Sequence, residues 1–349
     1  MHSQSRLCFE ASSGLFEMIR SDKCTVVVTG VGAIIGQGII KSLRRLDREI
    51  RIVGIDRSDN SPGPHLVDHF YRKPTVDESS EEYLDFWLKL LSSSSIGLIL
   101  PALEEDLFFL NKHRTLLESK GVKVALNSDR LISKFSNKWL LGQELIAIGY
   151  PSIPSIRSIE WFKVLEKLGD APFLLKPLLG NGSRGIVRLK TETDLDYWNR
   201  IIEYDWMIQK IVGNDQEEFT VGVFGLGHGK YVKPIIFRRL LSAAGNTQYV
   251  EVVSHHDVIE KAVERLCQHF CPLGPTNFQF RTEGNTAYLL EINARFSSSN
   301  SLRTAFGYNE SKMAIDFYLN ERTPDTPSIS KGKGWRYSED FIVYDRATV

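Results

Sequence analysis

The hydrophobic pattern of the first 127 residues alternates between short apolar runs and stretches with helical spacing. It predicts the following elements: a strand, a glycine-rich turn and a helix over 24–46, a strand over 50–58, a loop over 59–74, a helix over 81–93, a strand and a helix over 96–114, and a strand over 122–127. Strands and helices in this order are typical of an α/β domain with a parallel, doubly wound sheet.

Beyond residue 127 the pattern changes to neighbouring strands joined by short turns, with helices between them. It predicts a helix over 128–149, a hairpin with a glycine loop over 173–189, a helix over 194–204, strands over 207–212, 217–227 and 230–241, a helix over 258–270, a hairpin over 276–296, a helix-rich segment over 301–321 and a last strand within 335–345. Because closely spaced strands pair antiparallel, we expect an α+β second part.

Composition narrows the class of protein without naming a function. At roughly 150 residues per domain, a chain of 349 residues predicts two or three domains. The 43 basic and 43 acidic residues cancel, which argues against a nucleic-acid or membrane partner. No apolar stretch reaches the length of a membrane span, and residues 1–22 read as an extension, not as a signal peptide. The four cysteines indicate neither a disulfide framework nor a complete zinc site, which favours a cytoplasmic protein.

The segment 29–38, TGVGAIIGQG, follows a strand and opens a helix, as the phosphate-binding turn of dinucleotide-binding folds does. Asp56 ends the next strand, where an acidic residue would accept a ribose hydroxyl. An NAD-dependent sugar-nucleotide oxidoreductase or epimerase is therefore one hypothesis. It needs a Tyr and a Lys four residues apart, and the chain offers this spacing at Tyr308 and Lys312, far from the glycine loop.

A second glycine loop follows the apolar strand that ends near Lys176, and its residues are Gly180, Gly182, Ser183, Arg184 and Gly185. Backbone amides in such a loop can close over phosphates, and the lysine adds a point charge. A plain turn is the alternative. Further along, the strand at 209–212 could present its backbone to an adenine edge, and Glu218 could accept both ribose hydroxyls.

The segment 288–300, YLLEINARFSSSN, carries polar residues at alternating positions of an apolar strand. Side chains two apart share a face, so Glu291 and Asn293 point the same way, with Arg295 next in line. An adjacent antiparallel strand would add Gln279. These hard oxygen ligands suit magnesium, and Arg295 could stabilise a transferring phosphoryl group. Polar groups on a hydrated strand face are the alternative.

Taken in order, these motifs resemble the ATP-grasp superfamily, and within it the branch similar to carbamoyl-phosphate synthase large chains. The series TNFQF, LLEINARF and AFGYN carries the resemblance. It implies a Rossmann-like pre-ATP-grasp domain followed by a two-lobed ATP-grasp fold. The implied division is an extension at 1–22, the pre-ATP-grasp domain at 23–128, a lid subdomain with a linker helix at 129–212, a metal-binding subdomain at 213–325 and a tail at 326–349.

The resemblance also implies roles for individual residues. The residues implied to bind ATP are Lys138, Lys176, Gly180, Gly182, Ser183, Gly185, Gln209, Lys210, Ile211, Val212 and Glu218. Those implied to act in catalysis are Arg295, Lys176 and Arg184, those implied to hold Mg²⁺ are Gln279, Glu291 and Asn293, and those implied to face the substrate are Gly32, Glu104 and Ser298. Two magnesium ions are expected, with Mn²⁺ able to substitute.

The implied activity is that of a carboxylate–amine ligase, which makes an acylphosphate from ATP and releases ADP and phosphate. The family usually has a proline where Ala294 stands and often an acidic residue where Gln279 stands. The segment 297–303, SSSNSLR, matches no acceptor, so an amino acid, a peptide and a sugar acid all stay open. Activation of bicarbonate or another small acid, a non-catalytic nucleotide-binding module and the NAD hypothesis are the alternatives. A homodimer is compatible with this interpretation.

Overall fold

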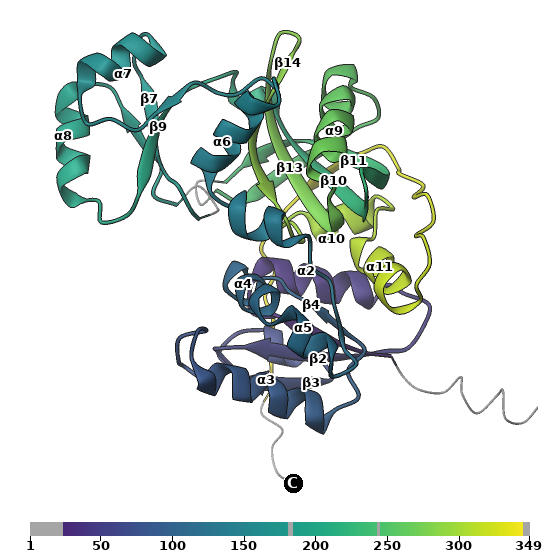
Figure 1. The fold of residues 1–349 in the computed structure, drawn as a ribbon. Helices are drawn as coiled ribbons and strands as arrows, with labels where there is room; N and C mark the ends of the chain where they lie inside the picture. The colour runs from purple at the N-terminus through teal and green to yellow at the C-terminus, as the bar shows by residue number, and fades with distance from the viewer. Residues whose placement is uncertain (1–23, 181–183, 243–244, 345–349) are drawn as a thin grey trace, which may run out of the picture.

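The computed structural model describes residues 24–180, 184–242 and 245–344, which fold into three β-sheets with helices around them (Figure 1). The sheets have the strand orders β3-β2-β1-β4-β5, β6-β9-β7-β8 and β14-β13-β10-β11-β12-β15. In the described part of the chain, no helix combines the length and the apolar character needed to cross a membrane.

The first sheet is wholly parallel, which confirms the predicted doubly wound N-terminal domain. Its elements are β1 (Cys24–Thr29), α2 (Ile34–Leu43), β2 (Ile50–Asp56), η2 (Gly63–Leu66), β3 (His69–Arg72), α3 (Glu81–Ser93), β4 (Leu98–Leu100), α4 (Glu104–Lys112), α5 (Arg114–Glu118) and β5 (Lys123–Val124). The expected loop at 59–74 is wrong in part, because β3 pairs with the edge of β2 and η2 precedes it. The strand has one partner only and little burial, so it lacks the apolar pattern used for prediction.

The second sheet forms a small lobe that stands apart from the rest of the molecule, at the upper left of Figure 1. It consists of β6 (Ser155–Ile156), α7 (Trp161–Leu168), β7 (Phe173–Pro177), β8 (Val187–Leu189), α8 (Glu192–Ile201) and β9 (Trp206–Lys210). The predicted hairpin at 173–189 is confirmed as the β7–β8 pair, and the lobe has an apolar core of its own. Residues 181–183, which include Gly182 and Ser183, lie outside the described residues.

The segment between these two sheets differs from the single helix expected at 128–149. A π-helical turn, η3 (Arg130–Lys134), ends before α6 (Lys138–Ala147) begins. The side chain of Asn137 accepts hydrogen bonds from the backbone N–H groups of Trp139 and Leu140, at 3.0 and 3.1 Å. This N-cap gives α6 a start of its own, and Lys138 becomes its first residue.

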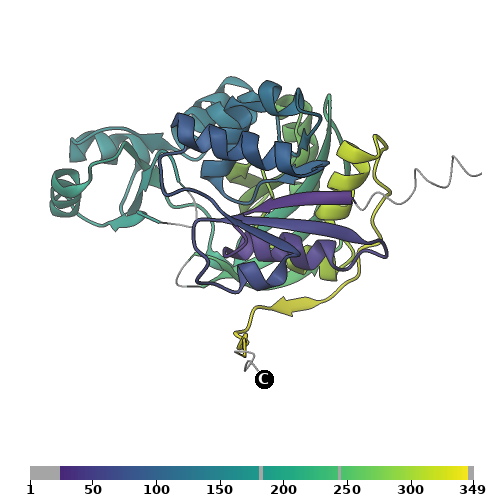
Figure 2. The ribbon, with the colours of Figure 1, turned by 90° about the horizontal axis from the view of Figure 1, so that it is seen from below.

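The third sheet is antiparallel and carries the polar residues of the sequence motifs. Its elements are η4 (Asp215–Glu217), β10 (Glu218–Gly227), β11 (Lys230–Leu241), β12 (Thr247–Val253), α9 (Asp257–Phe270), β13 (Leu273–Glu283), β14 (Thr286–Asn293), α10 (Asn300–Ala305), α11 (Glu310–Ala314), η5 (Ile315–Leu319) and β15 (Lys333–Trp335). Strand β12 was not predicted, and the last strand ends at Trp335, where the predicted one began. Helix α2 of the first domain packs against α10 and α11, and this contact joins the first and third sheets (Figures 1 and 2).

Candidate active site

A pocket of about 580 Å³ lies between the start of α2, the small lobe and the third sheet, and it is called the central pocket below. Its lining includes Ala33, Ile34 and Ile35 at the start of α2, residues of the small lobe, and the polar face of the third sheet. Seven described lining residues are basic and two are acidic, which favours an anionic ligand. The basic ones are Lys138, Lys176, Arg184, Lys210, Arg239, Arg281 and Arg295, and the acidic ones are Glu218 and Glu291.

Strand register places the polar residues of the third sheet in three rows on one face. Glu218 of β10 lies opposite Arg281 of β13 in the first row. Thr220, Gln279 and Glu291 make the second row, and Gly222, Asn277 and Asn293 make the third. Alternate residues share a face, so the rows follow from strand pairing alone.

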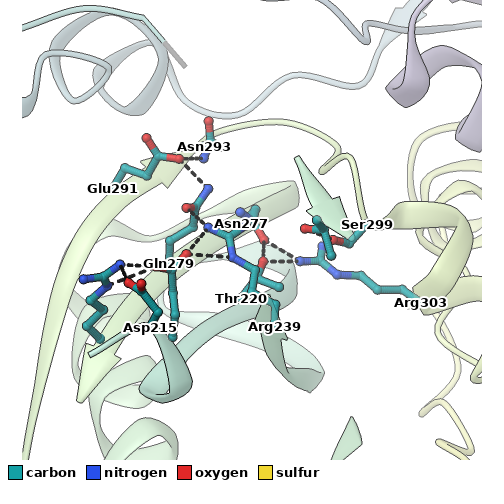
Figure 3. A network of polar contacts seen from close by, with 12 residues as sticks. Asp215, Thr220, Arg239, Asn277, Gln279, Glu291, Asn293, Ser299 and Arg303 are labelled. Atoms are coloured by element: carbon teal, nitrogen blue, oxygen red, sulfur yellow. Dashed lines mark hydrogen bonds and ion pairs between the residues drawn. The ribbon is translucent and has the colours of Figure 1, made fainter. Parts of the chain in front are cut away.

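The second and third rows contain two oxygen atoms suited to a hard cation. Oε1 of Glu291 accepts hydrogen bonds from Nε2 of Gln279 and, at 2.9 Å, from Nδ2 of Asn293 (Figure 3). Within the described residues, no hydrogen bond reaches Oε2 of Glu291 or Oδ1 of Asn293, and both residues line the central pocket. One carboxylate and one amide oxygen, with room for phosphates and water, fit the preferences of magnesium.

Gln279 differs from the metal ligand that the sequence predicts. Its Oε1 accepts a hydrogen bond from Nη2 of Arg239, and its Nε2 faces Glu291. A guanidinium has donors only, so the amide oxygen must point to Arg239. To ligate a metal beside Glu291, Gln279 would have to turn its amide over and release Arg239.

Glu218 lies between two guanidinium groups and is 4% exposed. Its Oε1 accepts from Nε and Nη2 of Arg239, at 3.1 and 2.9 Å. Its Oε2 accepts from Nε and Nη2 of Arg281, at 3.0 and 2.9 Å. Both oxygens are therefore fully engaged, and the predicted contact with ribose hydroxyls would have to replace some of these four bonds.

The two predicted lysines come from strand β7 of the small lobe, which carries Lys176, and from the start of α6, which carries Lys138. Nζ of Lys176 donates to Oε1 of Gln209 at 2.7 Å, and Nζ of Lys138 donates to the carbonyl of Gly180 at 2.6 Å. Burial, and next to it the charge of Lys138, lowers the pKa of Lys176 to about 8. The strand end at 209–212 and Arg184 line the same pocket.

Arg295 links the third sheet to the first domain. Its side chain is 8% exposed, Nη1 donates to the carbonyl of Phe296 at 3.0 Å, and Nη2 lies 3.7 Å from Oε1 of Glu104. Its Nε is buried and has no hydrogen-bond partner among the described residues. The pair brings Glu104, at the start of α4, next to the pocket, although the described lining does not include Glu104 itself.

Of the other two predicted substrate residues, Ser298 belongs to the described lining of the pocket and Gly32 does not. Ser298 lines the pocket, and its carbonyl accepts a hydrogen bond from Nη2 of Arg336. The N–H of Gly32 donates to Oδ2 of Asp56 at 2.8 Å, and Gly32 is not part of the described lining. Oδ1 of Asp56 accepts from the N–H of Ser58 at 3.2 Å. Both oxygens of the predicted NAD ribose acceptor thus bind the protein's own backbone.

The Tyr and Lys pair that the NAD hypothesis needs makes other contacts in the structure. Tyr308 is fully buried, Lys312 pairs with Asp316 at 2.7 Å, and neither residue belongs to the described lining of the pocket. The two residues therefore do not form a proton-donor pair at the glycine loop.

Sequence reasoning missed Arg239, Arg281 and Asn277, which all line the pocket. Each lies on the same strand face as a predicted residue, since Arg281 and Asn277 are two residues on either side of Gln279. Extending the alternation rule along β13 would have found these two. Arg239 needed the β10–β11 register, which the sequence does not give.

Comparison with protein families matches two parts of the chain. Residues 26–125 match the N-terminal domain of PylC-like proteins, and residues 204–341 match the family described as ATP-grasp in the biosynthetic pathway with Ter operon. A comparison with curated protein sequences finds no match.

Solved structures share the fold at low sequence identity. The N5-carboxyaminoimidazole synthetase of Staphylococcus aureus, complexed with ADP, gives a TM-score of 0.68 at 18% identity and covers 88% of this chain and 80% of that one. The biotin carboxylase of Campylobacter jejuni gives a TM-score of 0.68 at 16% identity and covers 89% of this chain and 74% of that one. The biotin carboxylase domain of the Hydrogenobacter thermophilus 2-oxoglutarate carboxylase gives a TM-score of 0.65 at 16% identity. This match covers 87% of this chain and 72% of that one.

The PylC-like match covers the parallel first sheet, and the ATP-grasp match covers the antiparallel third sheet. The predicted superfamily and fold class are therefore confirmed, and the synthetase and carboxylase structures share that fold. The chain is an ATP-grasp superfamily protein, with a PylC-like N-terminal domain at 26–125 in front of the ATP-grasp match at 204–341.

Proposed function

We propose that this chain is an ATP-dependent carboxylate–amine ligase that works through an acylphosphate. The observation that carries the proposal is the convergence, in one basic pocket, of the oxygen pair of Glu291 and Asn293 with three cationic side chains, those of Lys138, Lys176 and Arg295. A pocket with this charge suits a polyphosphate, and its oxygen pair suits the cation that accompanies one.

In the proposed complex, ATP lies between the small lobe and the third sheet. The strand end at 209–212 would contact adenine, and Glu218 and its two arginines would lie at the ribose end. Lys138 and Lys176 would contact phosphates, under the loop that carries Arg184. Glu291 and Asn293 would hold magnesium, which when bound neutralises charge on the β- and γ-phosphates.

The proposed reaction has two steps. A carboxylate oxygen of the acid attacks the γ-phosphorus, the bond to the β,γ-bridging oxygen breaks, and ADP leaves. The nitrogen of the amine then attacks the acyl carbon, phosphate leaves, and the nitrogen loses a proton. Lys176 and Arg295 would stabilise charge on the phosphoryl oxygens, and closure of the small lobe would keep water from the acylphosphate.

The acid is proposed to bind at the end of the pocket formed by Arg295, Ser298 and the first turn of α2. The positive charge of Arg295, which lines the pocket, and the N-terminus of α2, which has no side-chain cap, both favour a negatively charged oxygen there. Glu104, 3.7 Å from Arg295, is proposed to orient that guanidinium. The chain would then act on two small molecules, and a homodimer is proposed because the 2-oxoglutarate carboxylase domain is described as a dimer.

Bicarbonate is a second candidate for the acid. The 2-oxoglutarate carboxylase domain was solved with bicarbonate, which supports a small inorganic acid as an alternative. ADP release that needs bicarbonate and no organic acid would favour this alternative over the ligase.

The first test is thermal unfolding with MgATP, with ATP plus a chelator, and with NAD. Ligand at about 100 times its dissociation constant adds roughly 2.7 kcal/mol of stability, which raises the melting temperature by several degrees. We expect stabilisation by MgATP, followed by ADP release on screening acids with amines. Stabilisation by NAD and none by MgATP would overturn the proposal.

A further inference from the structure

Asn277 is a buried amide on the polar face of the third sheet, 1% exposed and part of the pocket lining. Its Oδ1 accepts a hydrogen bond from Oγ1 of Thr220 at 2.6 Å and another from Nη2 of Arg303 (Figure 3). No hydrogen bond to its Nδ2 is found within the described residues, and Nδ2 is not among the fully enclosed atoms that lack a partner. Its two N–H groups therefore remain for a ligand in the pocket.

Arg303 fixes which end of the amide faces the pocket. A guanidinium donates and cannot accept, so the oxygen of Asn277 must turn toward Arg303 and the nitrogen must turn away. Nη2 of Arg303 also donates to Oγ1 of Thr220 at 3.2 Å, so the two residues that hold the oxygen are joined to each other. The Asn277 amide can therefore adopt only the orientation in which Oδ1 faces Arg303 and Thr220.

The position of Arg303 depends on its packing against Gly222 of strand β10. A Cβ on Gly222 would lie 2.8 Å from the guanidinium, so glycine is what allows Arg303 to lie flat against β10. Its charge is balanced by Glu310, whose Oε1 lies 3.1 Å from Nη1, and both side chains are at most 1% exposed. A fully buried ion pair is costly unless its geometry is well fixed, which points to a specific use of this arginine.

The strand register places Asn277 directly opposite Asn293, in the row next to Glu291. Of the two residues with an oxygen available for a cation, Asn293 is therefore its partner on β14, and Glu291 lies one row away on the same strand. Magnesium bound with ATP bridges the β- and γ-phosphates. With the row of Glu218 at the ribose end, a donor in the row of Asn277 would lie toward the γ-phosphoryl group.

We propose that Asn277 is a further catalytic residue whose Nδ2 donates a hydrogen bond to an oxygen of the γ-phosphoryl group of ATP, and that Arg303 is the positioning residue that orients it. The inference rests on the proposed binding of MgATP in the central pocket. It adds a neutral donor that keeps its contact as the phosphoryl group moves to the acid.

The test compares MgATP and MgADP, which differ by that phosphoryl group. Asn277→Asp keeps an oxygen for Arg303 and Thr220 and replaces the donor by an acceptor that repels phosphate. We expect the dissociation constant for MgATP to rise by about 10- to 100-fold, as for a hydrogen bond to a charged group, and that for MgADP to change by less than about threefold. Asn246→Asp is the matched control, because it adds the same charge at the exposed rim of the pocket.

The role of Arg303 is tested with the pair Arg303→Met and Glu310→Gln in one chain, against Glu310→Gln alone. The double variant removes the buried charges together and frees the amide to turn over. We expect it to lower the preference for MgATP over MgADP by about three- to tenfold, whereas Glu310→Gln alone keeps that preference. A purely structural role would lower the melting temperature and leave the ratio unchanged.

The outcomes separate the two proposals. Wild-type protein that binds neither nucleotide would overturn the proposed function and this inference with it. Wild-type binding of MgATP, with the same ratio of MgATP to MgADP affinity in Asn277→Asp, would overturn the inference alone. Equal weakening of both nucleotides would also overturn it, because the amide would then contact a part that they share.

Discussion

Lys176 makes the nucleotide affinity of the central pocket depend on pH. Burial and the nearby charge of Lys138 lower its pKa to about 8, and the weaker influence of Glu291 does not restore it. Its hydrogen-bond partner, Gln209, is a neutral amide at 2.7 Å. A bound polyphosphate would supply the missing negative charge, so we expect MgATP to return the pKa toward the ordinary lysine value of about 10.4.

The direction and size of the change in MgATP affinity with pH follow from that shift in the pKa of Lys176. In the free protein Lys176 is charged below pH 8 and loses its proton above it, and only the charged form attracts phosphate. About 90% of the free protein carries neutral Lys176 at about pH 9, so MgATP binding there should take up roughly 0.9 proton, against about 0.1 at pH 7. Affinity should fall about fivefold between pH 8 and 9, which is close to 1 kcal/mol.

The assay is titration calorimetry in pairs of buffers with different ionisation enthalpies, since the difference in heat gives the number of protons taken up. Lys176→Met should bind MgATP more weakly at every pH and take up almost no proton at pH 9. Lys210→Met is the matched control, because Lys210 lines the same pocket and should leave the proton uptake in place. Uptake near zero in the wild-type protein at pH 9, or full uptake in Lys176→Met, would refute the reasoning.

Three further variants test the site and the fold. Glu291→Ala should abolish magnesium-dependent ADP release and leave the melting temperature within a few degrees, so turnover near the wild-type rate would contradict the metal assignment. Gly222→Ala would place a Cβ 2.8 Å from the Arg303 guanidinium and should cost about 1–3 kcal/mol in urea unfolding, whereas an unchanged midpoint would count against that packing. Lys73→Met leaves the charge of Asp106, 2.6 Å away, buried without its partner and should cost about 3–5 kcal/mol; adding Asp106→Leu should recover most of this, and an equal loss in both variants would contradict the account.

The sequence predicted those features that depend on local periodicity. The strands of the first sheet are short apolar runs, and their parallel pairing follows from the helices between them. Alternation along β14 likewise put Glu291 and Asn293 on one face, and β13 lies beside it with Gln279 opposite Glu291. In both cases a pattern within about ten residues is enough to predict the strand and the side chains that share one of its faces.

The partners of these residues could not be predicted, because they depend on contacts between distant segments. Arg239 reaches Glu218 and Gln279 only because β11 pairs with β10 in one particular register. Arg303 reaches Asn277 from a helix that follows β14. The sequence therefore predicted Gln279 and Glu218 as free ligands, whereas Gln279 is held by the buried Arg239, and Glu218 by Arg239 and the partly buried Arg281.

The glycine motif at 29–38 shows how a local pattern can predict the right structure for the wrong reason. A Cβ on Gly36 would lie 2.2 Å from the carbonyl oxygen of Gly30, so a glycine there lets α2 approach the end of β1. A Cβ on Gly38 would lie 1.8 Å from Oδ1 of Asn300, so that glycine lets α10 of the ATP-grasp domain pack on α2. Nδ2 of Asn300 donates to the carbonyl of Ile35 at 3.1 Å across the same contact. Gly36 thus serves packing within the first domain and Gly38 serves packing between domains. The contact between α2 and α10 holds the first turn of α2 at the end of the central pocket where the acid substrate is proposed to bind.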